Sequence, residues 1–167
     1  EFGNRLLAFV VAAAAGLVLF AVIRAGRRKD IKTLAWISLI GVVVQAVIGG
    51  ISVRLDLRWW SVAVHFLPSM VLVFVAAMLY MRIAETDSAV PTRRYPGSAQ
   101  TWTLIAAAAL CLVLVTGTMV TGSGPHSGDA GAGMDGRLEM DTRVLAYVHA
   151  ACMYLYLIAT IITTVLL

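Results

Sequence analysis

The sequence predicts an all-α protein, a polytopic bundle of transmembrane helices. The chain has 167 residues, of which 60% are hydrophobic and 13% charged, about half the charge of a soluble domain. Its mean hydropathy is +0.89. Apolar runs that reach the roughly 18 to 20 residues needed to cross a bilayer occur five times along the chain. We therefore expect the protein to work inside the membrane or at its surface, with membrane lipid as its first partner.

The five predicted helices follow one another with short polar connections. They cover residues 6–23, 33–53, 59–81, 101–121 and 144–167. The first residues are already polar and begin without Met, and no basic segment precedes a short apolar run, so the start does not resemble a signal peptide. The last run is still apolar at Leu167. These features predict the middle portion of a longer membrane protein.

The basic residues predict the orientation of the helices. They are concentrated in the connections after the first and third helices, as Arg24, Arg27, Arg28, Lys29 and Lys32 and then as Arg82, Arg93 and Arg94. The positive-inside rule places these connections in the cytoplasm of a bacterial cell, with the chain in the plasma membrane. The formal net charge of +4 is explained by this topology, and nothing in it indicates a nucleic-acid partner.

Two histidines lie inside the predicted helices at a matching depth. His65 is about six residues in from Trp59, and His149 is about seven in from Thr142, which puts both roughly 10 Å below the outer surface. An ionisable side chain inside a bilayer is expensive and usually serves a ligand, a proton or a metal. Neutral imidazole is a common axial ligand of haem iron between bundled helices, so haem is our first interpretation. A hydrogen bond to a neighbouring helix and a proton relay are the alternatives.

A weak internal repeat surrounds these histidines. The helix before that of His65 ends in a segment that contains Gly49 and Gly50. The helix before that of His149 ends in a segment that contains Gly117 and Gly122. Glycine lets a helix approach another helix, or a flat macrocycle, closely. In the first histidine helix, Pro68 lacks an N–H, frees the carbonyl of Val64 and kinks the helix, which can open a pocket.

Other polar residues are weaker candidates. His126 lies in an outer loop rich in Gly, Asp and Ser, as a lid residue or a further ligand. Glu1, Asn4 and Arg5 share one helical face, either as an ion pair at a helix end or as a carboxylate beside a substrate with Arg5 on a propionate. The two cysteines, Cys111 and Cys152, are single residues, which we expect to pack as small apolar side chains, and the chain has no Cys-x-x-Cys-His for covalent haem attachment.

Several of these segments together resemble haem A synthase. The most specific is Thr116-Gly117-Thr-Met-Val-Thr-Gly122-Ser-Gly-Pro125-His126-Ser-Gly-Asp129. The others are Glu1-Phe-Gly-Asn4-Arg5, Gln45 to Val53, Val64 to Ser69 and Val148-His149-Ala150. The resemblance covers nearly the whole chain.

The resemblance implies a fold and an activity. Such proteins have eight helices in two related four-helix halves, and this chain looks like helices two to six. It would then comprise the rest of a substrate-haem half (1–83), a cytoplasmic linker (84–99) and the start of a cofactor-haem half (100–167). Such enzymes oxidise the C8 methyl of haem O to a formyl group by successive hydroxylations, with haem b as cofactor. Haem O synthase and the cytochrome c oxidase assembly machinery are the implied partners, and a homo-oligomer is left open.

The resemblance also implies roles for single residues. Glu1 matches the essential carboxylate, His65 an axial ligand of the substrate half, and His149 a ligand of the cofactor haem whose partner lies on a helix beyond this chain. Asn4, Arg5 and His126 are further haem-binding candidates. Asn4 departs from the family pattern Glu-x-x-His-Arg, so haem in the first half would be held by His65 alone.

Two other functions remain open from the sequence. A non-enzymatic membrane haem-binding or assembly factor would need the same pockets without a catalytic carboxylate. A di-haem b-type electron-transfer cytochrome would need paired histidine ligands, typically towards both membrane faces, whereas both histidines here lie towards the outer face.

Overall fold

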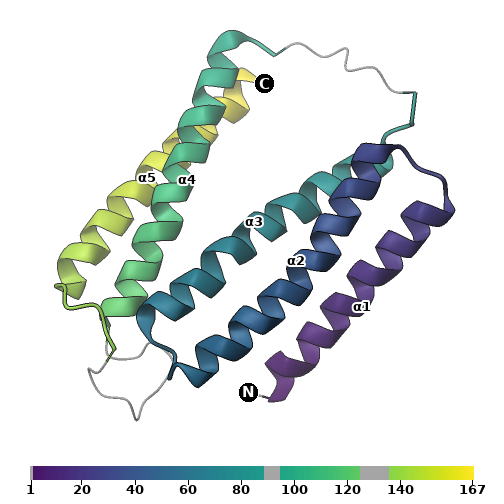
Figure 1. The fold of residues 1–167 in the computed structure, drawn as a ribbon. Helices are drawn as coiled ribbons and strands as arrows, with labels where there is room; N and C mark the ends of the chain where they lie inside the picture. The colour runs from purple at the N-terminus through teal and green to yellow at the C-terminus, as the bar shows by residue number, and fades with distance from the viewer. Residues whose placement is uncertain (1, 89–94, 125–135) are drawn as a thin grey trace. The chain divides into compact units, whose positions relative to one another are not determined.

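The computed structural model describes residues 2–88, 95–124 and 136–167, with side chains from Leu6 onward, and these residues form five α-helices (Figure 1). All five are long and apolar enough to cross a membrane, which confirms the predicted fold class. Their bounds are α1 Phe2–Arg24, α2 Lys29–Arg54, α3 Trp59–Ala84, α4 Gly97–Ser123 and α5 Thr142–Leu166.

The helices extend beyond the apolar runs from which they were predicted. α2 begins at Lys29 rather than at residue 33, and α4 begins at Gly97 rather than at residue 101. A backbone that crosses hydrocarbon must satisfy its own hydrogen bonds, so a helix continues through its polar flanks until water is available. Hydropathy marks only the hydrocarbon core of each span.

The chain divides into two compact units. One contains Glu1–Val53 and Val64–Val90, and the other contains Arg54–Ala63 and Pro91–Leu167. We call them the His65 unit and the His149 unit. The first turns of α3 therefore group with the later helices, while the rest of α3 groups with α1 and α2. The division of the sequence into domains around residues 84–99 stays a prediction.

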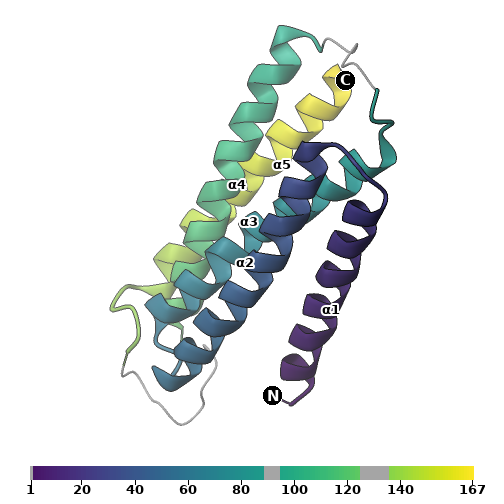
Figure 2. The ribbon, with the colours of Figure 1, turned by 45° about the vertical axis from the view of Figure 1, so that its right-hand side comes forward.

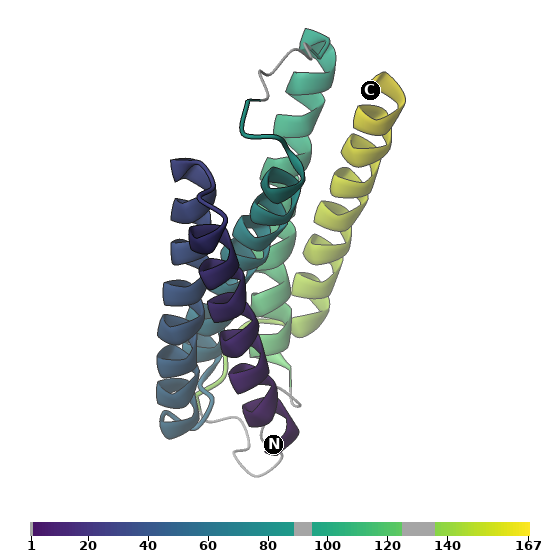
Figure 3. The ribbon, with the colours of Figure 1, turned by 90° about the vertical axis from the view of Figure 1, so that its right-hand side faces the viewer.

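In the His65 unit, α1, α2 and α3 lie side by side, as Figures 1 and 3 both show. Its buried apolar cluster lies where α1 ends and α2 begins, and is made of Leu19, Val22, Ile31, Ala35 and Leu79. Ile31 is fully buried. This packing closes one end of the three helices, and His65 lies towards the opposite end of α3.

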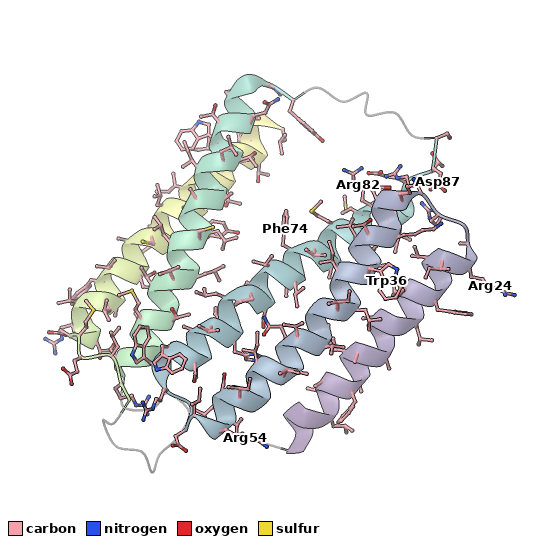
Figure 4. The ribbon with its side chains drawn as sticks, viewed as in Figure 1. Arg24, Trp36, Arg54, Phe74, Arg82 and Asp87 are labelled. Atoms are coloured by element: carbon pink, nitrogen blue, oxygen red, sulfur yellow. The ribbon has the colours of Figure 1, made fainter. Side chains whose placement is uncertain are left out.

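Charged residues reinforce the closed end of the unit. Arg27 donates to Asp87 at 2.8 Å, and to the carbonyls of Ile83 and Glu85 at 3.0 and 2.6 Å. Arg28 donates to Glu85, whose carboxylate raises the pKa of the guanidinium. Figure 4 shows Arg82 and Asp87 together at this end of the unit. The connection between α1 and α2, predicted to be cytoplasmic, is thus tied to the end of α3.

In the His149 unit, α4 and α5 run antiparallel and side by side (Figure 2). Asp141 caps α5 by accepting from the N–H groups of Arg143 and Val144. At the end of α4, a Cβ on Gly122 would lie 2.9 Å from the Cβ of Trp59, so only glycine allows the start of α3 to approach this closely. These contacts fix the turn from which α5, and with it His149, begins.

Candidate functional site

His65 lies on α3, six residues after the helix begins at Trp59, and is half-buried. Its imidazole lies against Gly49 of α2. A Cβ on Gly49 would be 3.0 Å from the imidazole Cε1 and 3.4 Å from Nε2. The glycine predicted to allow close approach therefore makes room for the histidine ring itself.

A buried glutamine holds the other edge of this ring. Gln45 lies one helical turn before Gly49 on α2 and is 8% exposed. The amide orientation that satisfies all its neighbours has Nε2 donating to His65 Nδ1 at 2.9 Å and to the His65 carbonyl at 3.1 Å. In the same orientation, Gln45 Oε1 accepts from the backbone N–H of Ser69 at 3.3 Å. One side chain thus contacts both the ring and the backbone of the histidine helix.

Pro68 lies in the same turn of α3 as these backbone groups. A proline ring inside a helix removes one hydrogen bond and disturbs the neighbouring ones. Just beside it, the hydroxyl of Ser69 donates to the His65 carbonyl at 2.8 Å, and the N–H of Ser69 turns to Gln45. The loosened turn after His65 is therefore satisfied by side chains of both α2 and α3.

A cleft of about 570 Å³ runs along the three helices of the His65 unit. Its polar residues are few, and they include Gln45, His65 and Ser69. From there the cleft follows α3 to Tyr80 and Ile83, about 27 Å at 1.5 Å per residue. Small side chains of α1 and apolar side chains of α3 form most of the remaining wall. The volume lies in the range of small-molecule sites, roughly 300 to 1,000 Å³.

His149 lies on α5, seven residues after the helix begins at Thr142, and is half-buried. Its imidazole lies against Gly117 of α4, where a Cβ would be 3.3 Å from Cε1 and 3.7 Å from Nδ1. Both histidines thus lie at the predicted positions in their helices, each against a glycine of the helix before it. The structure brings together the residue pairs of the internal repeat.

A threonine, and not an amide, holds the ring of His149. Thr116 Oγ1 lies 3.0 Å from His149 Nδ1. The same hydroxyl is 2.7 Å from the carbonyl oxygen of Leu112 and 3.2 Å from that of Val113, both of which can only accept. Its single proton therefore goes to the α4 backbone, which leaves an oxygen lone pair facing Nδ1.

The remaining predicted site residues contribute no side-chain geometry. Glu1 and His126 lie outside the described residues. Asn4 and Arg5 lie in the first turns of α1, before Leu6, the first residue whose side chain the structure describes. Their predicted roles stay predictions. Cys152 is half-buried, but Cys111 is exposed on α4, so the expectation that it packs in the core is wrong. Its helix presents that face outward, as a membrane helix can without loss because lipid is apolar.

Neither Gln45 nor Thr116 was predicted from the sequence to be a site residue. A signal was present for the first, because an amide in the middle of an apolar span is retained only when it has partners. Thr116 gave no such signal, since threonine commonly bonds the backbone of its own helix. Only the structure shows that both residues reach a histidine.

These features define a class of protein: an α-helical, multi-pass membrane protein with two histidines held between helices at corresponding depths. The comparison with family models is more specific. Residues 1–143 match the model of the COX15-CtaA family, described as cytochrome oxidase assembly protein, so the chain belongs to that family. A search of curated proteins and a search of solved structures each find no significant match. The protein therefore takes part in the assembly of cytochrome oxidase.

Proposed function

We propose that this protein is a haem A synthase, which oxidises the C8 methyl of haem O to the formyl group of haem A. The family supplies the context, since haem A is a prosthetic group of cytochrome c oxidase. The proposal locates the enzyme in the plasma membrane of a bacterium, with its haem sites towards the outer face. Haem O would be the substrate and haem b the resident cofactor.

One observation carries the proposal: two imidazoles lie at the same helical depth, each against a glycine and each with Nδ1 bound by a side chain. Metal-bound histidine almost always has its second nitrogen held by a hydrogen bond, which fixes the ring. The contacts therefore fit haem ligation through Nε2 of His149, and through Nε2 of His65 once the Gln45 amide turns its oxygen to Nδ1. A structural role in helix packing would not need the same arrangement twice.

The cleft supports the assignment of haem O to the His65 unit. Haem O carries a long isoprenoid tail, and the cleft that begins at His65 and continues to Tyr80 is long and nearly all apolar. Burial of apolar surface contributes roughly 25 cal/mol per Å², so a chain in this cleft would add substantially to binding. The tail would distinguish haem O from haem b in this half.

The proposed reaction is two successive hydroxylations of one methyl carbon. Each exchanges a C–H bond for a C–OH bond and removes two electrons from the carbon, and loss of water from the resulting diol leaves the formyl group, so that R–CH3 + O2 gives R–CHO + H2O overall. Dioxygen from outside the chain is the proposed four-electron acceptor, and haem b, when bound, would supply one-electron transfer. Among the chain's own residues, Glu1 is the proposed base for methyl protons, Arg5 a partner for a propionate, and His126 a residue of the covering loop.

The test is to extract haem from membranes that contain the full-length protein and a haem O synthase, in a host that lacks haem A. We expect a new chromatographic peak with the mass and reduced spectrum of haem A, absent with His149→Ala. Thr118→Val is a control, because Thr118 is a buried threonine of the neighbouring α4 whose hydroxyl donates to the carbonyl of Val115 in its own helix. Haem b and haem O bound without any oxidised product would contradict the enzyme and favour a haem-binding assembly factor or a cytochrome.

A further inference from the structure

We infer that the two histidines are held in opposite tautomers, so that Thr116 makes His149 a permanent haem ligand while Gln45 makes His65 a releasable one. The inference rests on the proposed function, since it concerns how each histidine would bind haem iron. It assigns Gln45 and Thr116 as positioning residues, which act through the imidazoles and do not touch the iron.

A neutral imidazole has one N–H and one lone pair. To bind iron through Nε2, histidine must keep its proton on Nδ1, and the group facing Nδ1 must therefore accept a hydrogen bond. A group that donates to Nδ1 instead places the proton on Nε2 and blocks ligation. The hydrogen-bond partner of Nδ1 thus decides whether the ring is ready for iron.

At His149 the partner accepts, because its own proton is given to the α4 backbone. Thr116 has one hydroxyl proton, and the carbonyl of Leu112 takes it at 2.7 Å. Nδ1 of His149 must then donate to Thr116 Oγ1 across 3.0 Å, which leaves the Nε2 lone pair free. The ring is in the tautomer that iron needs before haem arrives, and nothing has to change for it to bind.

At His65 the partner donates. Gln45 Nε2 gives its two protons to His65 Nδ1 and to the His65 carbonyl, and its Oε1 accepts from the N–H of Ser69. The imidazole proton is therefore on Nε2. For iron to bind, the amide of Gln45 must turn over so that Oε1 faces Nδ1–H.

Turning the amide over has a defined consequence. Gln45 would lose its bonds to the His65 carbonyl and to the Ser69 N–H. The carbonyl keeps a partner, because the Ser69 hydroxyl donates to it at 2.8 Å, whereas the N–H of Ser69 no longer has the amide oxygen of Gln45 as an acceptor. Haem binding at His65 is therefore opposed by the loss of these bonds, and haem binding at His149 is not.

The difference suits the two proposed roles. A cofactor haem stays with the enzyme through many turnovers, whereas haem O must enter and haem A must leave. Asn4 stands where the family pattern has a second histidine in the first half, which leaves His65 as the sole histidine ligand there among the matched positions. Because His65 is a sole ligand and Gln45 favours its haem-free state, this site is suited to the exchange of haem.

The inference is tested by haem release from the full-length protein loaded with haem b in both halves. Excess apo-globin captures the released haem, and the Soret band follows its transfer. We expect two phases, with the fast one absent after His65→Ala. Gln45→Glu, which offers Nδ1–H only acceptors, should slow the fast phase about tenfold, and Gln45→Met, which no longer donates to Nδ1 and so no longer favours the empty state, should slow it by a smaller factor.

The slow phase tests the other histidine. Thr116→Val should speed the slow phase of haem release about tenfold and raise the midpoint potential of that haem. A tenfold change in the ratio of ferric to ferrous affinity corresponds to about 59 mV. Thr116→Ser should restore both values, and Thr118→Val should leave both unchanged. A single release rate for both haems, or a fast phase that Gln45→Met speeds up, would overturn the inference and leave the proposed function standing. Absence of haem from both halves would overturn both.

Discussion

The His65 and His149 units contain the same elements, a glycine-bearing helix followed by a histidine helix, yet they hold the histidine by different side chains. In the His65 unit, an amide one turn before the glycine reaches both the ring and its backbone. In the His149 unit, a hydroxyl directly before the glycine reaches only the ring. A repeated histidine therefore does not make a repeated site, because the side chain that bonds Nδ1 sets the position of the imidazole proton.

The surroundings differ as well. His65 opens onto a long apolar cleft between three helices, and the turn after it is loosened by Pro68. His149 follows a well-capped helix start, and no proline lies inside α5. The first unit has the features of a site that admits a ligand, and the second those of a site that retains one.

The largest expected effect comes from removing each ligand. We expect His149→Ala to lose the resident haem b and all haem A production. His65→Ala should keep haem b and its reduced spectrum while haem A production falls at least a hundredfold. Haem content by pyridine haemochrome and product by chromatography measure the two. If both variants lost the same haem, the two units would share one site and the comparison would fail.

Filling the cleft should affect haem O alone. Ala76 lines the cleft on α3, and its neighbour Ala77 does not. Overpacking an apolar site typically costs about 1–3 kcal/mol, so Ala76→Phe should weaken haem O binding roughly tenfold and leave haem b unchanged. Ala77→Phe is the matched control, also exposed on the same helix. Titration with haem O measures the affinity of each variant. Equal affinities of Ala76→Phe and Ala77→Phe would contradict the assignment of haem O to the cleft.

The two glycines should differ in their tolerance of a methyl group. A Cβ would lie 3.0 Å from the ring of His65 at Gly49, and 3.3 Å from the ring of His149 at Gly117. Gly49→Ala should therefore displace its histidine more, and weaken haem binding by up to about 2 kcal/mol, whereas Gly117→Ala should have an effect of about 1 kcal/mol or less. Haem titration of the two variants ranks them, and the reverse order would show that the rings are held less firmly than their contacts indicate.

The cap of α5 predicts a smaller effect confined to the His149 unit. Asp141→Ala removes the acceptor of two backbone N–H groups, which should destabilise the start of α5 by about 1 kcal/mol. Hydrogen exchange should rise in the first turn of that helix and stay unchanged around His65. Asp141→Asn, which can still cap, should restore protection, and a failure to do so would argue against the cap.

The smallest effect is expected at the closed end of the His65 unit. An exposed ion pair typically contributes about 0.2–1 kcal/mol, so Arg27→Ala should loosen the contact with Asp87 and raise hydrogen exchange between α1 and α2 modestly. The wild-type protection should fall towards that of the variant at high salt. Arg24→Ala, at the same end of the unit, is the control (Figure 4). Equal effects of the two variants would mean that general charge, and not this contact, protects the connection.

The sequence was sufficient for the fold class and for the histidines. Five apolar runs gave five helices, and counting from Trp59 and Thr142 put His65 and His149 at the depths where the structure has them. Helix ends were placed too far inside at Lys29 and Gly97, because hydropathy does not report the polar turns of a helix.

What the sequence could not supply is which side chain faces which. Gln45 is 20 residues before His65, and Thr116 is 33 before His149, so neither pairing follows from a local pattern. Each depends on how two helices are rotated against one another, which packing decides. The direction of the hydrogen bonds depends further on a third group, the carbonyl of Leu112 in one case and the N–H of Ser69 in the other.

The most direct measurement is the tautomer of each imidazole, by ¹⁵N NMR of the full-length, histidine-labelled protein in lipid bilayers, with His65→Ala and His149→Ala to assign the signals. Without haem, we expect the proton on Nδ1 in His149 and on Nε2 in His65. On addition of a diamagnetic gallium porphyrin, His65 should move its proton to Nδ1 while His149 keeps its own there. The same tautomer at both histidines before the porphyrin is added would contradict the account.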